Sequence, residues 1–293
     1  MGKNKGTVLI REMKYGVFKD VQLSAVLEKE GVVAIPFLKQ EELEEVKTYY
    51  NASHKNGDPS SLFDDIHMTV WDNNLEYKLG INEGLKSILR NAFERNFQDY
   101  RAISEQFILK KPGPQTTFPI HQDWSIVDEN HFYSLNIWIP LQDVDESNGA
   151  MWIVKGSHRI DQKIRGAGVL FPDYISIFPD LQEQMTLFPL KAGQALIFFH
   201  STIHGSPPNT SSSDRRVVQV SLLPKDAPVQ IYFQQGKDAP LEVHHPKEDF
   251  NFYYNNIRED SSKLPPSENP TEIKAPHTLN QFSIKELVEA FKA

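Results

Sequence analysis

Apolar residues near the start of the chain follow the spacing of a strand and then that of a helix. Residues 31–36 (GVVAIP) form a short continuous apolar run, which predicts a strand. In the next segment, LKQEELEEVKTYYN, apolar side chains recur near helical spacing from Leu38 to Tyr50. The simplest prediction is a strand that leads directly into a helix.

A second helix is predicted after a polar loop. Residues 51–66 are rich in Asn, Ser, Gly, Asp and Pro, which indicates a loop. Asn82 is a residue type that favours a helix N-cap, so we expect the second helix to start there and to end near residue 100. One apolar stripe follows, made of Leu85, Ile88, Leu89, Ala92, Phe93 and Phe97.

From residue 104 the pattern changes to short β-branched and aromatic runs. These runs are EQFILKK, FYSLNIWIPL, GAMWIV, QALIFFH and RRVVQVSLLP, and Gly- and Pro-containing turns separate them. Repeated short strands of this kind predict a sandwich or a barrel. We expect one domain over residues 1–293, with a helical wrap at about 31–100, a β core at about 104–235 and an irregular tail at about 236–293.

Two further segments have a predicted role or structure. Residues 160–184 form a long insertion between strands, for which a lid over a site and an inert surface loop are equally good interpretations. The segment SIKELVEAFK near the end of the chain predicts a short amphipathic helix.

Composition and charge narrow the function classes. Hydrophobic residues make up 39% of the chain and charged residues 24%, which is ordinary for a globular protein. The net charge of −8 disfavours nucleic acid and anionic lipid as partners, and the absence of cysteine excludes thiolate chemistry and disulfides. Without a signal-like or membrane-spanning apolar run, we expect a cytoplasmic protein, with no prediction of its oligomeric state.

Three residues carry the clearest chemical signal. Residues two apart on a strand point to the same face, so His121 and Asp123 can bind one ion while Gln122 faces away. His204 lies far downstream, and the turn GSPPN after it would present its imidazole at a strand end. Two imidazoles and one carboxylate suit Fe(II) and leave coordination positions open for a cosubstrate and dioxygen. We therefore predict His121, Asp123 and His204 as metal ligands and catalytic residues.

Other histidines are interpreted as structural. The chain contains 10 His residues, and a lone histidine is more often a hydrogen-bonded structural residue than a ligand. His200 is the competing candidate for the third ligand. We interpret it as a packed strand residue, because a ligand is easier to present after the strand than within FFH.

Two arginines open the strand run RRVVQVSLLP. An arginine that points into a barrel can bind a carboxylate through two parallel hydrogen bonds, which lysine cannot reproduce. Adjacent strand residues point in opposite directions, so only one of Arg215 and Arg216 should face inward, and we favour Arg215.

Three segments of the chain carry a resemblance to a known family: WIPLQDVDESNGAMWIVKGSHR, LKAGQALIFFHSTIHGSPPN and DRR. With these segments the chain, from about Gly31 to Leu223, resembles the phytanoyl-CoA dioxygenase family of Fe(II)- and 2-oxoglutarate-dependent oxygenases. The family order is HxD, NGA with GSHR, HGS, and an arginine eleven positions after the distal histidine. Arg215 occupies that last position relative to His204.

By this resemblance, the fold is mainly β with flanking helices, a double-stranded β-helix or jelly-roll barrel of the cupin type. The iron ligands would be His121, Asp123 and His204. Arg215 would pair with the far carboxylate of 2-oxoglutarate, and Ser206 would hydrogen-bond the same group. Trp152 occupies a family position near the cosubstrate, where its indole would contact the cosubstrate or only pack the wall, and Lys110, Lys111 and Asn136 are weaker cosubstrate candidates.

The resemblance implies oxidation of a C–H bond of a small metabolite, using dioxygen and releasing succinate and CO2. Related enzymes that transfer chlorine need a small residue at the carboxylate ligand, so the presence of Asp123 favours hydroxylation, desaturation or ring closure. The absence of a basic cluster disfavours a CoA substrate and favours an amino acid derivative, a lipid or a biosynthetic intermediate. The candidate pocket residues are Trp124, His131, Tyr133, Phe171 and Tyr174.

Two alternatives stay open at this point. One is a metal-dependent jelly-roll enzyme that uses no 2-oxoglutarate, in which Arg215 would be structural. The other is a non-catalytic binding protein on the same barrel. A complete ligand triad and an inward arginine argue against the second alternative, and turnover of 2-oxoglutarate separates the first from the main prediction.

Overall fold

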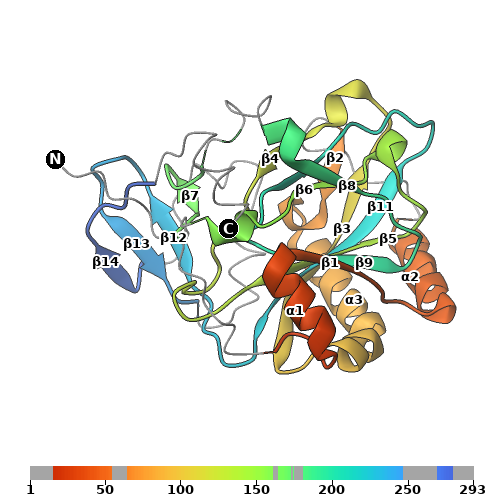
Figure 1. Cartoon of the computed structure of the whole chain (residues 1–293), viewed down its shortest axis with the longest axis horizontal. Helices are drawn as coiled ribbons and strands as arrows, with labels where there is room; N and C mark the ends of the chain where they lie inside the picture. The colour runs from red at the N-terminus through yellow and green to blue at the C-terminus, as the bar shows by residue number, and fades with distance from the viewer. Residues whose placement is uncertain are drawn as a thin grey trace.

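A six-stranded antiparallel sheet forms the largest part of the fold (Figure 1). The computed structural model describes residues 16–54, 65–160, 164–172, 174, 181–246 and 269–279. In sheet order the strands are β1 (Val32–Pro36), β9 (Gln194–Phe199), β5 (Leu135–Pro140), β11 (Arg215–Pro224), β3 (Tyr100–Lys110) and β2 (Ile66–Met68). Five of these strands contain the runs or the entry strand that the sequence predicts.

A four-stranded sheet packs against the inner face of the six-stranded sheet. Its strands, in order, are β4 (Phe118–His121), β10 (His204–Ser206), β6 (Met151–Val154) and β8 (Met185–Phe188). Met151 and Ile153 of this sheet share one buried cluster with Trp138, Leu196 and Val217 of the larger sheet. Two antiparallel sheets that enclose a common interior confirm the predicted jelly-roll fold.

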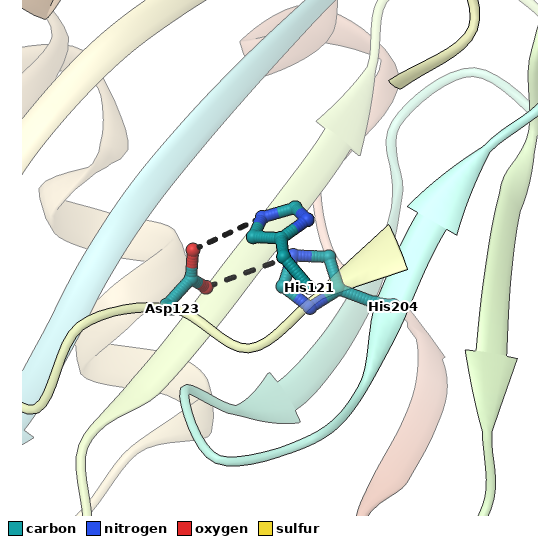
Figure 2. Close-up of side chains that lie close together, drawn as sticks. All are labelled: His121, Asp123 and His204. Atoms are coloured by element: carbon teal, nitrogen blue, oxygen red, sulfur yellow. Dashed lines mark ion pairs between the residues drawn. The ribbon is translucent and has the colours of Figure 1, made fainter. Parts of the chain in front are cut away.

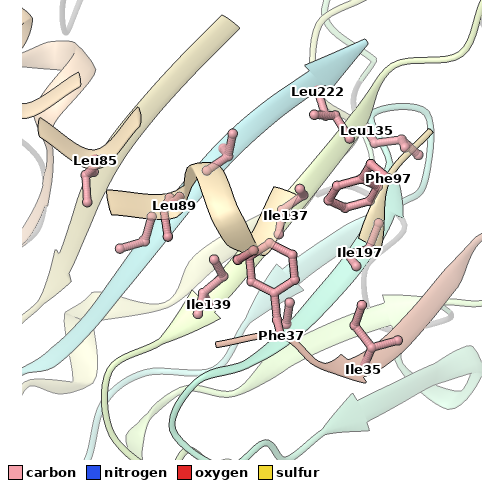
Figure 3. Close-up of a cluster of buried hydrophobic side chains, with 14 of the residues drawn as sticks. Ile35, Phe37, Leu85, Leu89, Phe97, Leu135, Ile137, Ile139, Ile197 and Leu222 are labelled. Atoms are coloured by element: carbon pink, nitrogen blue, oxygen red, sulfur yellow. The ribbon is translucent and has the colours of Figure 1, made fainter. Parts of the chain in front are cut away.

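Three helices cover the opposite face of the six-stranded sheet. They are α1 (Val21–Glu30), α2 (Gln40–Ser53) and α3 (Leu75–Asn96), as Figure 1 shows. Leu85 and Leu89 of α3 pack on Ile137 and Ile139 of β5 in the main hydrophobic core (Figure 3). None of the helices in the described part of the chain is long and apolar enough to cross a membrane.

The helical region differs from the prediction in two places. Helix α3 begins at Leu75, because the side chain of Asn74 accepts a hydrogen bond from the Tyr77 N–H and caps the helix there. Asn82, the predicted cap, is buried inside α3 and donates a hydrogen bond to Glu105. The sequence analysis did not predict α1, although Asp20 caps its start and Gly31 ends it in the left-handed conformation.

The tail is not uniformly irregular. Strands β12 (Ile231–Gln234), β13 (Leu241–His244) and β14 (Glu272–Lys274) form a small sheet that also contains β7 (Ala167–Gly168). This sheet joins the tail to the insertion, since β7 pairs with β12 in parallel. The predicted helix at residues 283–292 lies outside the described residues.

Candidate active site

His121, Asp123 and His204 converge at one end of the barrel. One ligand atom from each residue lies within 4.8 Å of the others. Figure 2 shows the three side chains turned toward one another, with the carboxylate facing both imidazoles. The His121 Nε2 atom lies 3.5 Å from Asp123 Oδ1, and the His204 Nε2 atom lies 3.7 Å from Asp123 Oδ2. This arrangement is a candidate metal site.

The two histidines are a cross-strand pair. His121 ends β4, His204 begins β10, and the two residues are partners in the antiparallel register, as expected for a strand that returns beside the first. The Nδ1 atom of His121 lies 2.8 Å from the Pro119 carbonyl oxygen, and that of His204 lies 2.9 Å from the Thr202 carbonyl oxygen. A carbonyl only accepts, so each Nδ1 carries the proton and each Nε2 offers its lone pair to the centre.

Asp123 departs from the prediction, because it lies beyond the end of β4 rather than on a strand. Its N–H donates to the His200 carbonyl oxygen (2.9 Å), which takes the chain out of the β4–β10 pairing. Its own carbonyl oxygen accepts a hydrogen bond of 2.7 Å from Arg165 Nε. The convergence with the histidines therefore depends on contacts that strand alternation does not supply. Gln122 is buried and bonds to Ser201 and Tyr174.

Electrostatics favour an ionised Asp123 carboxylate beside a neutral His204 imidazole. Burial opposes ionisation of Asp123, but nearby His204 and a hydrogen bond with His121 outweigh it and hold the pKa of Asp123 well below its usual range. Burial, reinforced by His121, lowers the pKa of His204 to about 4. Neutral imidazole and ionised carboxylate are the forms that bind a metal ion.

A second cluster of polar side chains lies next to the triad. Ser206 lies two residues after His204 on β10, and the Lys110 Nζ atom donates to Ser206 Oγ (2.5 Å) and to the Pro207 carbonyl oxygen (2.8 Å). Arg215 is the register partner of Lys110 across β11 and β3. Two basic side chains and a hydroxyl group therefore share the barrel interior beside the candidate metal site.

Both basic side chains are buried, with relative exposures of 0% for Lys110 and 3% for Arg215. Arg215 donates to the Gly149 carbonyl oxygen (2.9 Å) and lies over the Trp138 ring, while its Nε has no hydrogen-bond partner. Among the described residues, no carboxylate pairs with either cation. Burial and the charge of Arg215 lower the pKa of Lys110 to about 5. Such a pair is a candidate binding site for an anion.

The neighbouring Arg216 points the other way. Its guanidinium lies 5.0 Å from the centroid of the Tyr50 ring of α2 and 3.7 Å from a carboxylate oxygen of Asp214. The structure thus places Arg215 inside the barrel and Arg216 on the helical side, as strand alternation requires.

Trp152 requires a correction. It alternates along β6 with Met151 and Ile153, which pack in the barrel interior, and its register partner on β10 is Gly205. Its half-buried indole therefore lies on the outer face of β6, away from Lys110. The family position alone did not show which way the side chain points.

The other candidates fall into different places. The Asn136 amide donates to Asp123 Oδ2, so the structure brings Asn136 to the metal ligand rather than to Lys110 and Arg215. His200 is buried beside the triad but is not one of the three converging ligands. Lys111, half-buried at the end of β3, donates its N–H to the Asp65 carbonyl oxygen.

Of the five pocket candidates, Phe171 packs against a triad member. Its ring lies 6.3 Å from the imidazole of His121, nearly parallel to it, and the residue is 44% exposed. The others have different surroundings: Tyr174 bonds Gln122, Tyr133 packs on Phe199, Trp124 packs on a separate core cluster, and His131 is exposed.

Sequence reasoning missed three polar residues that support Asp123. Gln106 and Gln219 are buried in the barrel interior and link Asn136 to the chain at Val70. Both interrupt apolar strand runs, which is a signal that was available in the sequence. Arg165 of the insertion pairs through two hydrogen bonds with Glu129, and no local pattern marks that contact.

Two curated proteins are similar to this chain over about half of their length. Phytanoyl-CoA dioxygenase domain-containing protein 1 of Danio rerio is 25% identical over 149 residues, which cover 47% of this chain and 51% of that protein. Phytanoyl-CoA dioxygenase of Arabidopsis thaliana is 28% identical over 128 residues, which cover 42% of this chain and 44% of that protein. The chain spans about half the length of the curated relatives it matches.

A solved structure and a family model cover more of the chain. The crystal structure of the non-heme alpha-ketoglutarate-dependent carbocyclase SnoK from nogalamycin biosynthesis superposes with a TM-score of 0.53 at 23% identity. The match covers 74% of this chain and 89% of SnoK, and it supports the jelly-roll fold. The model of the phytanoyl-CoA dioxygenase (PhyH) family matches residues 27–217, which include all three triad residues and Arg215. The chain therefore belongs to the phytanoyl-CoA dioxygenase family.

Proposed function

We propose that the protein is an Fe(II)- and 2-oxoglutarate-dependent dioxygenase that oxidises a C–H bond of a small-molecule metabolite, most simply by hydroxylation. The observation that carries this proposal is the placement of two buried basic side chains, Lys110 and Arg215, beside the convergent His121, Asp123 and His204, with no carboxylate paired to either among the described residues. Metal ligands alone fit many reactions, but an adjacent anion site fits a carboxylate-bearing cosubstrate.

The donor set fits Fe(II). Two imidazole nitrogens and one carboxylate form the facial set typical of non-heme iron oxygenases, and the proton on each Nδ1 leaves Nε2 available. His121, Asp123 and His204 would hold the metal ion. When bound with 2-oxoglutarate and dioxygen, Fe(II) supplies the coupling of C–H oxidation to decarboxylation of 2-oxoglutarate, with succinate and CO2 as products.

The cation pair fits the far carboxylate of 2-oxoglutarate. Arg215 offers a planar fork of N–H donors, one of them an Nε without a partner, and Ser206 adds a hydroxyl group. Trp138 lies against the guanidinium and limits its movement. Since Ser206 lies on the same short strand as His204, one elongated dicarboxylate can reach both sites.

The remaining residues orient the reaction and limit access of water. Phe198 packs on the imidazole of His204 with ring centroids 4.7 Å apart, and Phe118 packs on that of His121 at 5.1 Å. Phe171 of the insertion lies nearly parallel to the imidazole of His121, with ring centroids 6.3 Å apart. An apolar surround of this kind keeps ligand side chains in place and lowers the local dielectric constant.

The experiment that tests the proposal is production of succinate from 2-oxoglutarate. Protein reconstituted anaerobically with Fe(II) is exposed to oxygen with and without a pooled metabolite extract, and Asp123→Ala serves as the inactive control. We expect succinate that depends on Asp123 and increases with the extract, which then provides an assay for isolating the substrate. Bound iron without any succinate would contradict the proposal.

A further inference from the structure

Asp123 is held in a different way from the two histidines of the triad. His121 and His204 are strand residues that pair with each other in the sheet. Asp123 lies past the end of its strand, so no ladder of main-chain hydrogen bonds fixes its side chain. Its carboxylate accepts instead from the side chain of Asn136, which lies on β5 of the other sheet.

Asn136 is the last member of a chain of amide groups across three adjacent strands. The Gln219 Nε2 atom on β11 donates to Asn136 Oδ1, and the Gln106 Nε2 atom on β3 donates to Gln219 Oε1 at 2.5 Å. Gln106 and Gln219 are direct register partners, so their side chains lie on the same face. All three amides are nearly buried, with exposures of 4% for Gln106, 8% for Gln219 and 5% for Asn136.

A main-chain N–H group fixes which amide of this series donates and which accepts. The Val70 N–H donates to Gln106 Oε1 at 3.2 Å, and a main-chain N–H has no alternative role. If Gln106 were flipped, its NH2 group would face another donor. Gln106 must therefore donate to Gln219, Gln219 to Asn136, and Asn136 to the carboxylate of Asp123.

The anchor at Val70 is itself rigid. Val70 lies in the short helix η1 (Thr69–Trp71), and Thr69 Oγ1 both donates to the Phe107 carbonyl oxygen (3.2 Å) and accepts from the Phe107 N–H (3.1 Å). Phe107 is the residue after Gln106 on β3. The start of the amide chain is thus attached to the same strand that carries its first member.

We infer that Gln106 and Gln219 are positioning residues, which keep the NH2 group of Asn136 directed at Asp123 so that the carboxylate is oriented for the metal before the metal binds. This inference rests on the proposed function. A fixed donor at one carboxylate oxygen restricts rotation of the side chain and favours its ionised form. It also gives Asn136 a role other than contact with 2-oxoglutarate.

Two substitutions and their combination test this inference. Gln219→Met keeps the length and volume of the side chain but removes the donor to Asn136, and Asn136→Ala removes the donor to Asp123. The measurements are the affinity of the metal-free protein for Co(II) by anaerobic calorimetry and the visible absorption of the bound Co(II). We expect each single variant to bind Co(II) about 10- to 100-fold more weakly and to show a changed Co(II) spectrum.

The double variant Gln219→Met/Asn136→Ala distinguishes a positioning role of Gln219 from a general loss of barrel stability. If Gln219 acts through Asn136, Gln219→Met has no further effect on Co(II) affinity once Asn136 is Ala. Gln194→Met is the matched control, because Gln194 lies at the start of β9 and its side chain accepts a hydrogen bond from the Lys191 N–H instead. We expect this control to leave Co(II) affinity and spectrum unchanged.

Wild-type protein and Asp123→Ala are measured in parallel. Asp123-dependent Co(II) binding that is unchanged in Gln219→Met overturns the inference while the proposed function stands. Additive losses in the double variant overturn it as well, since they show that Gln219 does not act through Asn136. Absence of Asp123-dependent metal binding in the wild type overturns the proposed function, and the inference with it.

Discussion

The two faces of the six-stranded sheet differ in chemistry, although they alternate along the same strands. On β11, Val218, Val220 and Leu222 point to the helices and belong to the main hydrophobic core. Gln219 and Ser221, which alternate with them, point into the barrel and join a hydrogen-bonded network. Because successive side chains of a strand point to opposite faces, one face of the sheet packs on the helices (the helical face) and the other carries the polar groups of the site (the chemical face).

This difference teaches that stability and chemistry can be altered independently in one strand. The face of the sheet that packs on the helices contributes to the free energy of folding by burying apolar surface, and this contribution does not depend on ligands. The barrel interior contains two buried basic side chains and a carboxylate, which under the proposed function pair with cosubstrate and metal ion. Substitutions on the two faces should therefore have separable effects.

Asp123→Ala should have the largest effect on the chemical face. We expect no measurable succinate, because the substitution removes the only carboxylate among the three converging ligands. The side chain lies outside the described apolar clusters, so the variant should stay folded, and loss of the hydrogen bond from Asn136 should lower the melting temperature by only about 2–6 °C. Succinate production is measured alongside thermal unfolding, and wild-type turnover in this variant would remove Asp123 from the metal site.

Ile137→Ala, on the helical face of β5, should lower stability and leave cosubstrate binding unchanged. Ile137 is fully buried in the main core, so we expect the free energy of unfolding in urea to fall by about 2–5 kcal/mol. The KM for 2-oxoglutarate should be unchanged at temperatures where the variant is folded. A raised KM with normal stability would break the proposed separation of the two faces.

Arg215→Ala should weaken binding of 2-oxoglutarate by about 10- to 100-fold, since it removes a charged hydrogen-bond donor from the anion site. Calorimetry on the Ni(II)-loaded protein measures this affinity without turnover. Arg216→Ala is the matched control on the opposite face and should leave the affinity unchanged. The assignment of the two arginines is reversed if the control shows the larger loss.

Much of the fold could be predicted from sequence because strands follow local rules. Short β-branched and aromatic runs between turns indicated most of the strands and a sandwich or barrel, and the family resemblance narrowed this to a jelly roll. Alternation also predicted that only one of Arg215 and Arg216 faces inward. The HxD pattern marked His121 and Asp123 as candidate ligands, whereas His204 was identified by the turn that follows it.

The features that were missed depend on distant parts of the chain. Asp123 leaves its strand because its N–H bonds to the His200 carbonyl oxygen, which the HxD pattern does not encode. Trp152 faces outward because of its register with Gly205, and the role of Gln219 depends on amides from two other strands. Tertiary register therefore decides what the periodic pattern leaves open.

Lys110 gives the smallest and most specific prediction, a pH dependence of cosubstrate binding. Burial and Arg215 lower the pKa of Lys110 to about 5, so its amine is mostly neutral at pH 7 in the free protein. A bound dicarboxylate raises this pKa, and binding then takes up one proton. The charge of Lys110 contributes fully to 2-oxoglutarate binding below pH 5, and this contribution is lost as the pH rises toward the pKa of Lys110 in the complex. The Kd for 2-oxoglutarate should therefore increase by about tenfold per pH unit between about pH 6 and 8.

Calorimetry of the Ni(II)-loaded protein in buffers of different ionisation enthalpy measures the proton uptake directly. Lys110→Met should remove both the uptake and the slope, whereas an unchanged slope in this variant would assign the titrating group to another residue.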